Sequence, residues 1–250
     1  HRYQADKYYN PLRDYIHHIP RLFKAKKLNE HATDMIEHLI NDKTAYWVFP
    51  MQMQNDYQLR ENSAFRHQSE AMEKVIEAFA ASASENDRLV FKIHPMDNGI
   101  EPWQKILDAI TGKYDLKGRV HFIDGGNLMR LIKHSRGVIT INSTVGLHSL
   151  QAFKPVYVLG CAIYDIEGLS SSQSLHEFFE NPDAPDKKLL QAFVRLLAAS
   201  IQVKGDFFTR AGRQMAIEGF ASKLLNQQVN AHGAFIDSPK RNLDKCQFWK

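Results

Sequence analysis

The stretch GVITINSTVGLHSLQAFKPVYVLG, residues 137–160, has the pattern of a strand, a polar turn, a short helix and a second strand. Its β-branched run at 138–141 is typical of a buried parallel strand. The polar residues 142–144 favour the start of a helix, and the Lys-Pro pair at 154–155 ends it. The stretch therefore predicts a compact βαβ unit, and this unit sets the fold class.

Hydroxyl side chains gather at the turn inside this unit. Asn142, Ser143 and Thr144 follow the carboxyl end of the predicted strand and precede the predicted helix. Such a turn in a parallel sheet is a natural place for a phosphate group. The alternative is that these side chains only cap the helix, and the residues alone leave both interpretations open.

The same alternation of strands and helices runs upstream from residue 45. Strands are predicted at 45–50, 89–93 and 120–123, and helices at 69–81, 103–110 and 128–134. Spacings of this kind are typical of successive βαβ units. The sequence therefore predicts an α/β protein with a Rossmann-like, mainly parallel sheet that has helices on both faces.

The polarity and the predicted secondary structure change along the chain and suggest three segments. Residues 1–44 are polar and helical, 45–170 hold the Rossmann-like pattern, and 171–250 are a helical segment followed by a polar tail. Within the last segment, helices are predicted at 186–201 and 212–225. Because the chain begins at His1 and is short for a two-domain enzyme, we expect it to be a truncated piece.

The composition and net charge limit the kinds of molecule that the chain is expected to bind. The chain has 250 residues, is 44% hydrophobic and carries a net charge of +4. This surplus suits an anionic small molecule or an anionic membrane surface and is too small to indicate nucleic acid. No nucleic-acid module, Walker motif or Gly-rich dinucleotide fingerprint is present.

Localisation and metal content follow from what the sequence lacks. It has no apolar run of about 18 residues and no secretory signal. Cys161 and Cys246 form neither a disulfide framework nor a metal-binding spacing. We therefore expect no metal and a reducing, cytoplasmic setting, with peripheral attachment to the inner face of the cytoplasmic membrane as a second option.

A loop dense in amide side chains follows the first predicted strand. It reads MQMQNDYQLR, residues 51–60, and contains Gln52, Gln54, Asp56 and Gln58. Amides offer both hydrogen-bond donors and acceptors, so such a cluster suits a ligand with many hydroxyl groups. An ordinary polar loop is the competing interpretation, and without further context it is slightly favoured.

A histidine and a proline follow the strand at 89–93. Pro95 fixes the turn and biases His94 away from helix, which holds the imidazole at the carboxyl end of the strand. A lone histidine is more often structural than functional. Its position at a strand end nevertheless favours a role in ligand binding.

Three motifs in this order resemble a known family. They are FPMQMQNDYQ at 49–58, KIHP at 92–95, and INSTVG at 141–146 followed by Lys154-Pro-Val. Over about residues 45–170 the chain resembles the capsule polysaccharide synthesis and export family of Gram-negative bacteria. Better understood members of that family are retaining transferases of β-Kdo, an acidic eight-carbon sugar, and they use CMP-Kdo as donor.

The resemblance implies a GT-B-type glycosyltransferase, of which this chain would supply the donor half with helical flanking segments. Such an enzyme would transfer Kdo with retention onto a lipid or Kdo-primer acceptor in capsular polysaccharide synthesis. Its partners would be the CMP-sugar donor, a lipid-linked acceptor at the inner membrane and the capsule export complex. The resemblance implies no cofactor besides the donor substrate.

The resemblance also implies roles for individual residues. His94 with Pro95, and Ser143 with Thr144, would hold the cytidylate, and Asp56 would be the nucleophile that double displacement requires. Lys92, Arg60 and Arg66 could offset the carboxylate of the sugar. The donor site would also include Gln52, Gln54, Gln58, Asn142 and His148.

Two features of the pattern depart from the family or stay unassigned. Many GT-B donor sites carry a glutamate where His148 stands, which weakens a general nucleotide-sugar inference. The general acid/base is not assigned, and Asp97 and Glu61 are only remote candidates for it.

Two other functions remain open. One is a teichoic-acid-type CDP-polyol phosphotransferase, which would need no carboxylate nucleophile. The other is a non-catalytic interaction protein of capsule export, since a fold does not imply an activity.

Overall fold

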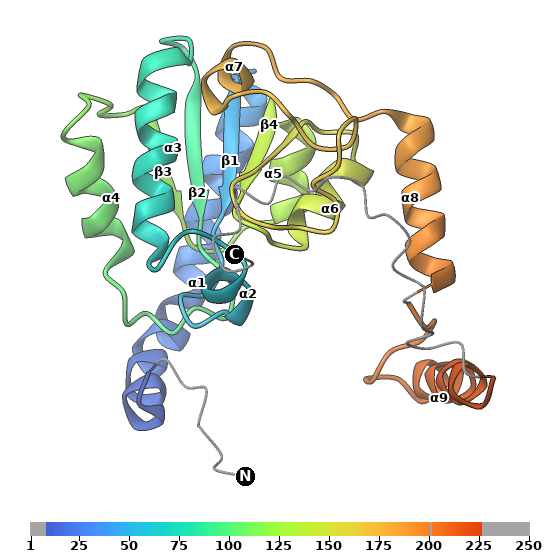
Figure 1. Ribbon diagram of the computed structural model, residues 1–250. Helices are drawn as coiled ribbons and strands as arrows, with labels where there is room; N and C mark the ends of the chain where they lie inside the picture. The colour runs from blue at the N-terminus through green and yellow to red at the C-terminus, as the bar shows by residue number, and fades with distance from the viewer. Residues whose placement is uncertain (1–8, 201, 227–250) are drawn as a thin grey trace. The chain divides into compact units, whose positions relative to one another are not determined.

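A five-stranded parallel sheet forms the centre of the computed structural model, which describes residues 9–200 and 202–226. The strands lie in the order β3-β2-β1-β4-β5 (Figure 1). They are β1 (Tyr46–Pro50), β2 (Arg88–Lys92), β3 (Val120–Ile123), β4 (Gly137–Thr140) and β5 (Val156–Val158). All four pairings are parallel, which confirms the predicted Rossmann-like sheet.

Helices cover both faces of the sheet, as predicted. One cover consists of α3 (Gln68–Ser82), α4 (Trp103–Thr111) and α7 (Leu175–Glu180). The other consists of α1 (Pro11–Asn41), α5 (Leu128–His134) and α6 (Val145–Gln151). Figure 1 shows α3 in front of the sheet and α1 behind it.

The strand β1 is an almost continuous hydrophobic run because helices bury it on both faces of the sheet. Trp47 faces α7, where its ring lies 5.2 Å from Phe178 and 5.0 Å from Phe179. Tyr46 faces the other way, and its hydroxyl donates to the carbonyl of Leu131 in α5 at 2.7 Å. Burial of each large side chain stabilises the fold by about 2–3 kcal/mol.

The order of the strands creates a crevice at one edge of the sheet. The chain moves outward from β1 to β2 and β3, then returns to place β4 on the other side of β1. In open parallel sheets, ligands bind beyond the carboxyl ends of the strands at such a switch point. Adjacent strands lie roughly 5 Å apart, so the ends of β2 and β4 are about 10 Å apart.

One short helix departs from the prediction. Residues 51–60 were expected to form a loop, but α2 (Tyr57–Glu61) occupies the second half of this stretch. The side chain of Asp56 caps it by accepting from the backbone N–H of Gln58 at 2.9 Å. A helix of five residues is too short to give an apolar periodicity, so only its cap could have revealed it.

The helix α1 packs against the loop that connects β3 to α5. Gly126 adopts a positive φ of 69°, and a Cβ there would lie 2.6 Å from the side chain of Ile36. Asn29 of α1 accepts from the backbone N–H of Gly126 at 2.8 Å. This contact brings the N-terminal helix to the carboxyl edge of the sheet. Residues 1–8 of the predicted helical segment 1–44 lie outside the described residues.

The chain divides into two compact units. The first holds the sheet and extends to Pro185, and the second begins at Asp186 with α8 (Lys187–Ser200) and α9 (Arg210–Leu225). The functional division into 1–44, 45–170 and 171–250 stays a prediction, and the tail from residue 227 lies outside the described residues.

None of the described helices has the length and hydropathy needed to cross a membrane. Cys161 is disulfide-bonded, whereas the two cysteines had suggested no disulfide.

Candidate functional site at the carboxyl edge of the sheet

The loop after β1 is held in place by glutamine side chains. The amide of Gln68 in α3 accepts from the backbone N–H of Gln52 at 2.7 Å and donates to its carbonyl at 2.9 Å. Gln54 accepts from the backbone N–H of Gln68 at 2.9 Å and donates to the carbonyl of Arg66 at 3.1 Å. Gln54 is buried, so its amide stabilises the loop.

A second amide pair joins the ends of β1 and β4. Gln52 donates through its side chain to Asn142 at 2.9 Å and accepts from the backbone N–H of Asn142 at 3.2 Å. The amide of Asn142 also donates to the carbonyls of Gln58 and Asn62, at 2.8 and 3.0 Å. These bonds fix α2 against the turn after β4.

Asp56 lies at the start of α2, between these two strand ends. One carboxylate oxygen accepts from the backbone N–H of Gln58, and the other accepts a long bond of 3.4 Å from the side chain of Gln52. The residue is half-buried. Its carboxylate is therefore held in one orientation, while the second oxygen keeps most of its capacity to interact with another group.

His94 follows β2 and is held in one tautomer. Its Nδ1 accepts from the backbone N–H of Met96 at 3.1 Å. A backbone N–H can only donate, so the proton of the neutral ring is on Nε2. Burial lowers the pKa of His94 below 6.5, and the carboxylates of Asp97 and Asp56 partly oppose this shift. The neutral ring therefore offers an Nε2–H donor at pH 7.

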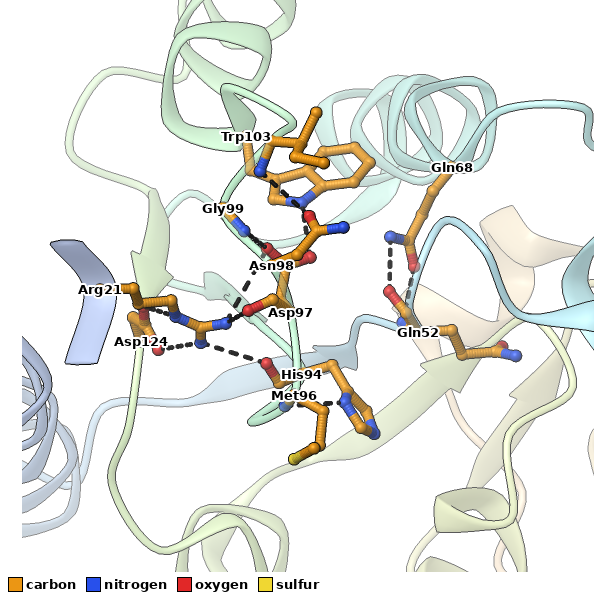
Figure 2. A network of polar contacts seen from close by, with 11 residues as sticks. Arg21, Gln52, Gln68, His94, Met96, Asp97, Asn98, Gly99, Trp103 and Asp124 are labelled. Atoms are coloured by element: carbon orange, nitrogen blue, oxygen red, sulfur yellow. Dashed lines mark hydrogen bonds and ion pairs between the residues drawn. The ribbon is translucent and has the colours of Figure 1, made fainter. Parts of the chain in front are cut away.

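A buried polar network supports the His94 turn (Figure 2). Arg21 of α1 donates to both carboxylate oxygens of Asp124, at 2.6 and 3.1 Å, and to the carbonyl of His94 at 3.2 Å. Asp97 accepts from the backbone N–H of Gly99 at 2.8 Å and from the indole of Trp103 at 3.0 Å. Since both oxygens of Asp97 are bonded, this residue has a structural role rather than the remote acid/base role considered above.

The turn between β4 and α6 presents Ser143 and Thr144. The hydroxyl of Ser143 accepts from the backbone N–H of Val145 at 3.2 Å, and its carbonyl accepts from the hydroxyl of Tyr164. Burial raises the pKa of Tyr164, so it remains a donor. Tyr164 reaches this position because Gly146 has no Cβ, which would lie 2.2 Å from the Tyr164 oxygen.

Thr144 differs from its neighbour in the turn. It is the N-cap of α6, it is exposed, and its side chain makes no capping hydrogen bond. No other hydrogen bond of its hydroxyl occurs within the described part of the chain. The hydroxyl is therefore available to a ligand at the crevice.

The other predicted site residues lie at the edges of this region. His148 is exposed on α6, one turn after Thr144. Pro95 is exposed in the turn after β2, whereas Lys92 is buried at the end of that strand. Gln58 is exposed on α2 and accepts from the side chain of Asn62 at 2.7 Å. Glu61, the other remote acid/base candidate, is exposed at the end of α2.

The three strand ends thus bring a carboxylate, a neutral imidazole and a free hydroxyl to one edge of the sheet. A pocket of about 290 Å³ lies beside His94 and is also lined by Met53, Asn55 and Asn98. This volume is at the lower end of the range for small-molecule sites. In residues 9–200 and 202–226, no group of three His, Cys, Asp or Glu residues could hold a metal ion.

Sequence reasoning missed the residues that support this edge. The local pattern marks Gln68 only as the approach to a helix, and Arg21 only as part of a polar N-terminal segment. Both act across long sequence separations, since Arg21 reaches Asp124 and Gln68 reaches Gln52. No local pattern could have identified them.

A comparison with protein families identifies the chain. The model of the family described as "Capsule polysaccharide biosynthesis protein" matches residues 1–208. The chain belongs to this family. The chain is also 33% identical over 225 residues to the capsule polysaccharide modification protein LipB of Neisseria meningitidis serogroup B, covering 84% of this chain and 54% of that protein. It is 32% identical over 163 residues to the capsule polysaccharide export protein KpsS of Escherichia coli, covering 65% and 42%.

The chain spans about half the length of the curated relatives that it matches. Among solved structures, the β-Kdo 2,7 transferase KpsC of Thermosulfurimonas dismutans is similar, with 21% identity and a TM-score of 0.40. The alignment covers 68% of this chain and 62% of that one. The family match, rather than this structural likeness, assigns the chain to capsule polysaccharide biosynthesis.

Proposed function

We propose that this chain forms the donor-binding half of a GT-B-type glycosyltransferase that transfers Kdo from CMP-Kdo with retention. The acceptor would be a lipid or a Kdo primer in capsular polysaccharide synthesis. Membership of the capsule polysaccharide family supports the pathway. The observation that carries the reaction type is Asp56, a carboxylate fixed at the crevice beside the ends of β1 and β4.

In this reaction the Asp56 oxygen that accepts only the long bond from Gln52 attacks the anomeric carbon of Kdo as the bond to the CMP phosphate breaks. Retention by double displacement requires such a covalent intermediate, in which an acceptor hydroxyl then attacks the anomeric carbon from the opposite side and displaces the Asp56 carboxylate. The cap contact with Gln58 orients the carboxylate before the donor binds. A fixed nucleophile lowers the entropic part of the barrier.

The leaving phosphate is stabilised by donors from two strand ends. The Nε2–H of His94 and the hydroxyl of Thr144 each donate to a phosphate oxygen, and their strands flank β1. Donors fixed in position stabilise the charge that develops in the transition state. The acceptor hydroxyl also needs a general base, and we assign this role to no residue at the ends of β1, β2 and β4.

The test compares two changes at Asp56. An asparagine side chain at this position would keep the oxygen that caps α2 but would be a very poor nucleophile. Asp56→Asn is therefore expected to lower kcat by roughly 10³-fold while CMP still raises the Tm. Asp56→Ala should lose both activity and the cap, at about 1 kcal/mol of stability. Turnover is measured as CMP release from CMP-Kdo.

The matched control is Asp206→Asn. Asp206 accepts from the backbone N–H groups of Phe208 and Thr209, so the change alters a similar turn far along the sequence. Its kcat should equal that of the unmodified protein. Full activity of Asp56→Asn would refute the nucleophile, and stabilisation by CDP-glycerol but not by CMP would favour the polyol phosphotransferase.

A second candidate is a non-catalytic role in capsule export. It is favoured by the description of the Escherichia coli relative as an export protein. This role predicts that no cytidine nucleotide changes the Tm and that CMP-Kdo is not consumed. The thermal-shift measurement above therefore distinguishes the two candidates.

A further inference from the structure

One side of the pocket beside His94 is formed by a residue that the proposed reaction does not use. The pocket has a volume of about 290 Å³, and Tyr9 of the N-terminal segment lines it together with Asn55 and His94. Asn55 directly precedes Asp56, whose carboxylate is close enough to His94 to influence its charge. Tyr9 therefore lines the space that adjoins the proposed nucleophile.

The hydroxyl of Tyr9 is bonded to a carboxylate from a distant part of the chain. It donates to Oε1 of Glu101, 92 residues further along, at 2.6 Å. Glu101 lies in the loop between β2 and α4 and is half-buried. It does not line the pocket beside His94, so Tyr9 connects the Glu101 carboxylate to that pocket.

A histidine holds the other side of this carboxylate. Oε2 of Glu101 lies 3.5 Å from Nε2 of His67. The Nδ1 of His67 accepts from the backbone N–H of Ser69 at 3.3 Å, so the proton of the neutral ring is on Nε2. A carboxylate can only accept, which commits the Tyr9 proton to Glu101. The phenol oxygen of Tyr9 can therefore act only as an acceptor toward another group.

The other proton-exchanging groups of the pocket are already committed. Among the described residues that line it, only Tyr9, His94 and Asp97 have side chains of this kind. His94 has its proton on Nε2 and accepts through Nδ1, so neither nitrogen can serve as a base. Both oxygens of Asp97 are bonded, to the backbone of Gly99 and to Trp103. Tyr9 alone is joined to a carboxylate that can take its proton.

We propose that Tyr9 and Glu101 form a proton relay that deprotonates the acceptor hydroxyl in the second step of transfer. The proposal rests on the function proposed above and supplies the base that it lacks. The acceptor oxygen forms a bond to the anomeric carbon, and the bond from that carbon to Asp56 breaks with its electron pair. The acceptor proton passes to the Tyr9 oxygen as the Tyr9 proton passes to Glu101, which later releases it to water.

The test separates the two steps, with CMP-Kdo as donor and a lipid that ends in Kdo as acceptor. The relay acts only after CMP has left. Tyr9→Phe should therefore release about one molecule of CMP per protein in a burst and retain Kdo on Asp56. Its kcat should fall roughly 100-fold. Rapid-quench assays of CMP and mass spectrometry of the intact protein measure both effects.

Two further variants sharpen this test. Glu101→Gln keeps an oxygen for the Tyr9 hydroxyl but is no base, so it should show the same burst and the same retained sugar. Tyr114→Phe, in the turn after α4, is the matched control and should keep the kcat of the unmodified protein. If Tyr9→Phe does not fold, Glu101→Gln tests the relay by itself.

Azide provides a readout that a structural role would not change. It attacks the anomeric carbon without losing a proton, so it needs no base. Azide should therefore release the retained sugar from Tyr9→Phe as a Kdo azide and restore turnover. Failure of azide to do so would overturn the relay.

The remaining outcomes distinguish the relay from the function on which it rests. An unchanged kcat in Tyr9→Phe, with a lower Tm, would make the bond to Glu101 a structural tether and overturn the relay alone. Loss of the CMP burst in that variant would also overturn it, because Tyr9 would then act in the first step. No release of CMP by the unmodified protein would overturn the proposed transferase and the relay together.

Discussion

The loop after β1 and the loop after β2 both follow a buried strand of the sheet, and they behave differently in the structure. The first is rich in amides. The side chains of Gln54 and Gln68 bond backbone groups, and the side chain of Gln52 bonds Asn142. The second contains one histidine, and after Nδ1 has bonded Met96 the Nε2–H of His94 remains available. The amide cluster is therefore a scaffold here, whereas the ring of His94 keeps a donor that its loop does not use.

This difference follows from the cost of burying polar groups. A loop that passes beneath other segments must satisfy its backbone N–H and C=O groups, and side-chain amides do this with both a donor and an acceptor. His94 lies in a turn whose carbonyls are already bonded by Arg21 and the backbone N–H of Asp97. Its ring therefore gives the loop only one bond, which Nδ1 accepts from the backbone N–H of Met96.

The largest effect on stability is expected at Gln68. Gln68→Leu would leave the backbone N–H and carbonyl of Gln52 buried without partners, which costs about 3 kcal/mol in the free energy of unfolding. Urea denaturation measures this loss. Gln58→Leu, at an exposed position, should cost less than about 0.5 kcal/mol. Equal effects of the two changes would mean that the amide cluster is not a scaffold.

A smaller effect is expected from pH, and it should depend on the loop after β2. Burial lowers the pKa of His94 in the folded protein below the unfolded value of 6.5. The unfolded chain therefore binds protons first, so stability is fully present above pH 6.5 and falls as the pH drops through the folded pKa. Since the ring is half-exposed, the loss should stay below about 1 kcal/mol.

Thermal denaturation between pH 7.5 and 5.5 measures this dependence. His94→Gln should reduce the fall in Tm on acidification, and His31→Gln, at an exposed position on α1, should leave it unchanged. His121 is half-buried, burial lowers its pKa as well, and it should supply part of the remaining pH dependence. A curve for His94→Gln identical to that of the unmodified protein would show that His94 is not the titrating group.

The smallest effect on stability is expected at Thr144, whose side chain makes no capping bond. Thr144→Val should change the free energy of unfolding by less than about 0.5 kcal/mol. It should weaken CMP binding about tenfold, which is the value of one hydrogen bond. Ser149→Ala is the matched control, because it removes a bond to the carbonyl of Val145 and should reduce stability without affecting CMP. Unchanged CMP affinity in Thr144→Val would remove the turn from the phosphate site.

Particular residues show which parts of the fold and of the candidate site could be predicted from the sequence. The run from Val138 to Ile141 and the turn chemistry of Asn142 to Thr144 identified the βαβ unit, because apolar period and capping are local properties. Predicted site residues lie at the ends of β1, β2 and β4, in accordance with the crevice rule. Among them are Gln52, Asp56, Lys92, His94, Asn142, Ser143 and Thr144. The helix α2 was missed because five residues cannot show a period.

The sequence by itself determined the parallel α/β fold and the edge of the sheet at which polar residues gather. Both depend on neighbours in the chain, namely hydrophobic period, caps and proline. The tertiary structure alone decided which polar groups are already satisfied. Gln54 is bonded within its loop, Thr144 keeps a free hydroxyl, and Lys92 faces a pocket beside Arg21 of α1. Those properties depend on contacts between segments up to a hundred residues apart, such as Arg21 with Asp124, which no local pattern encodes.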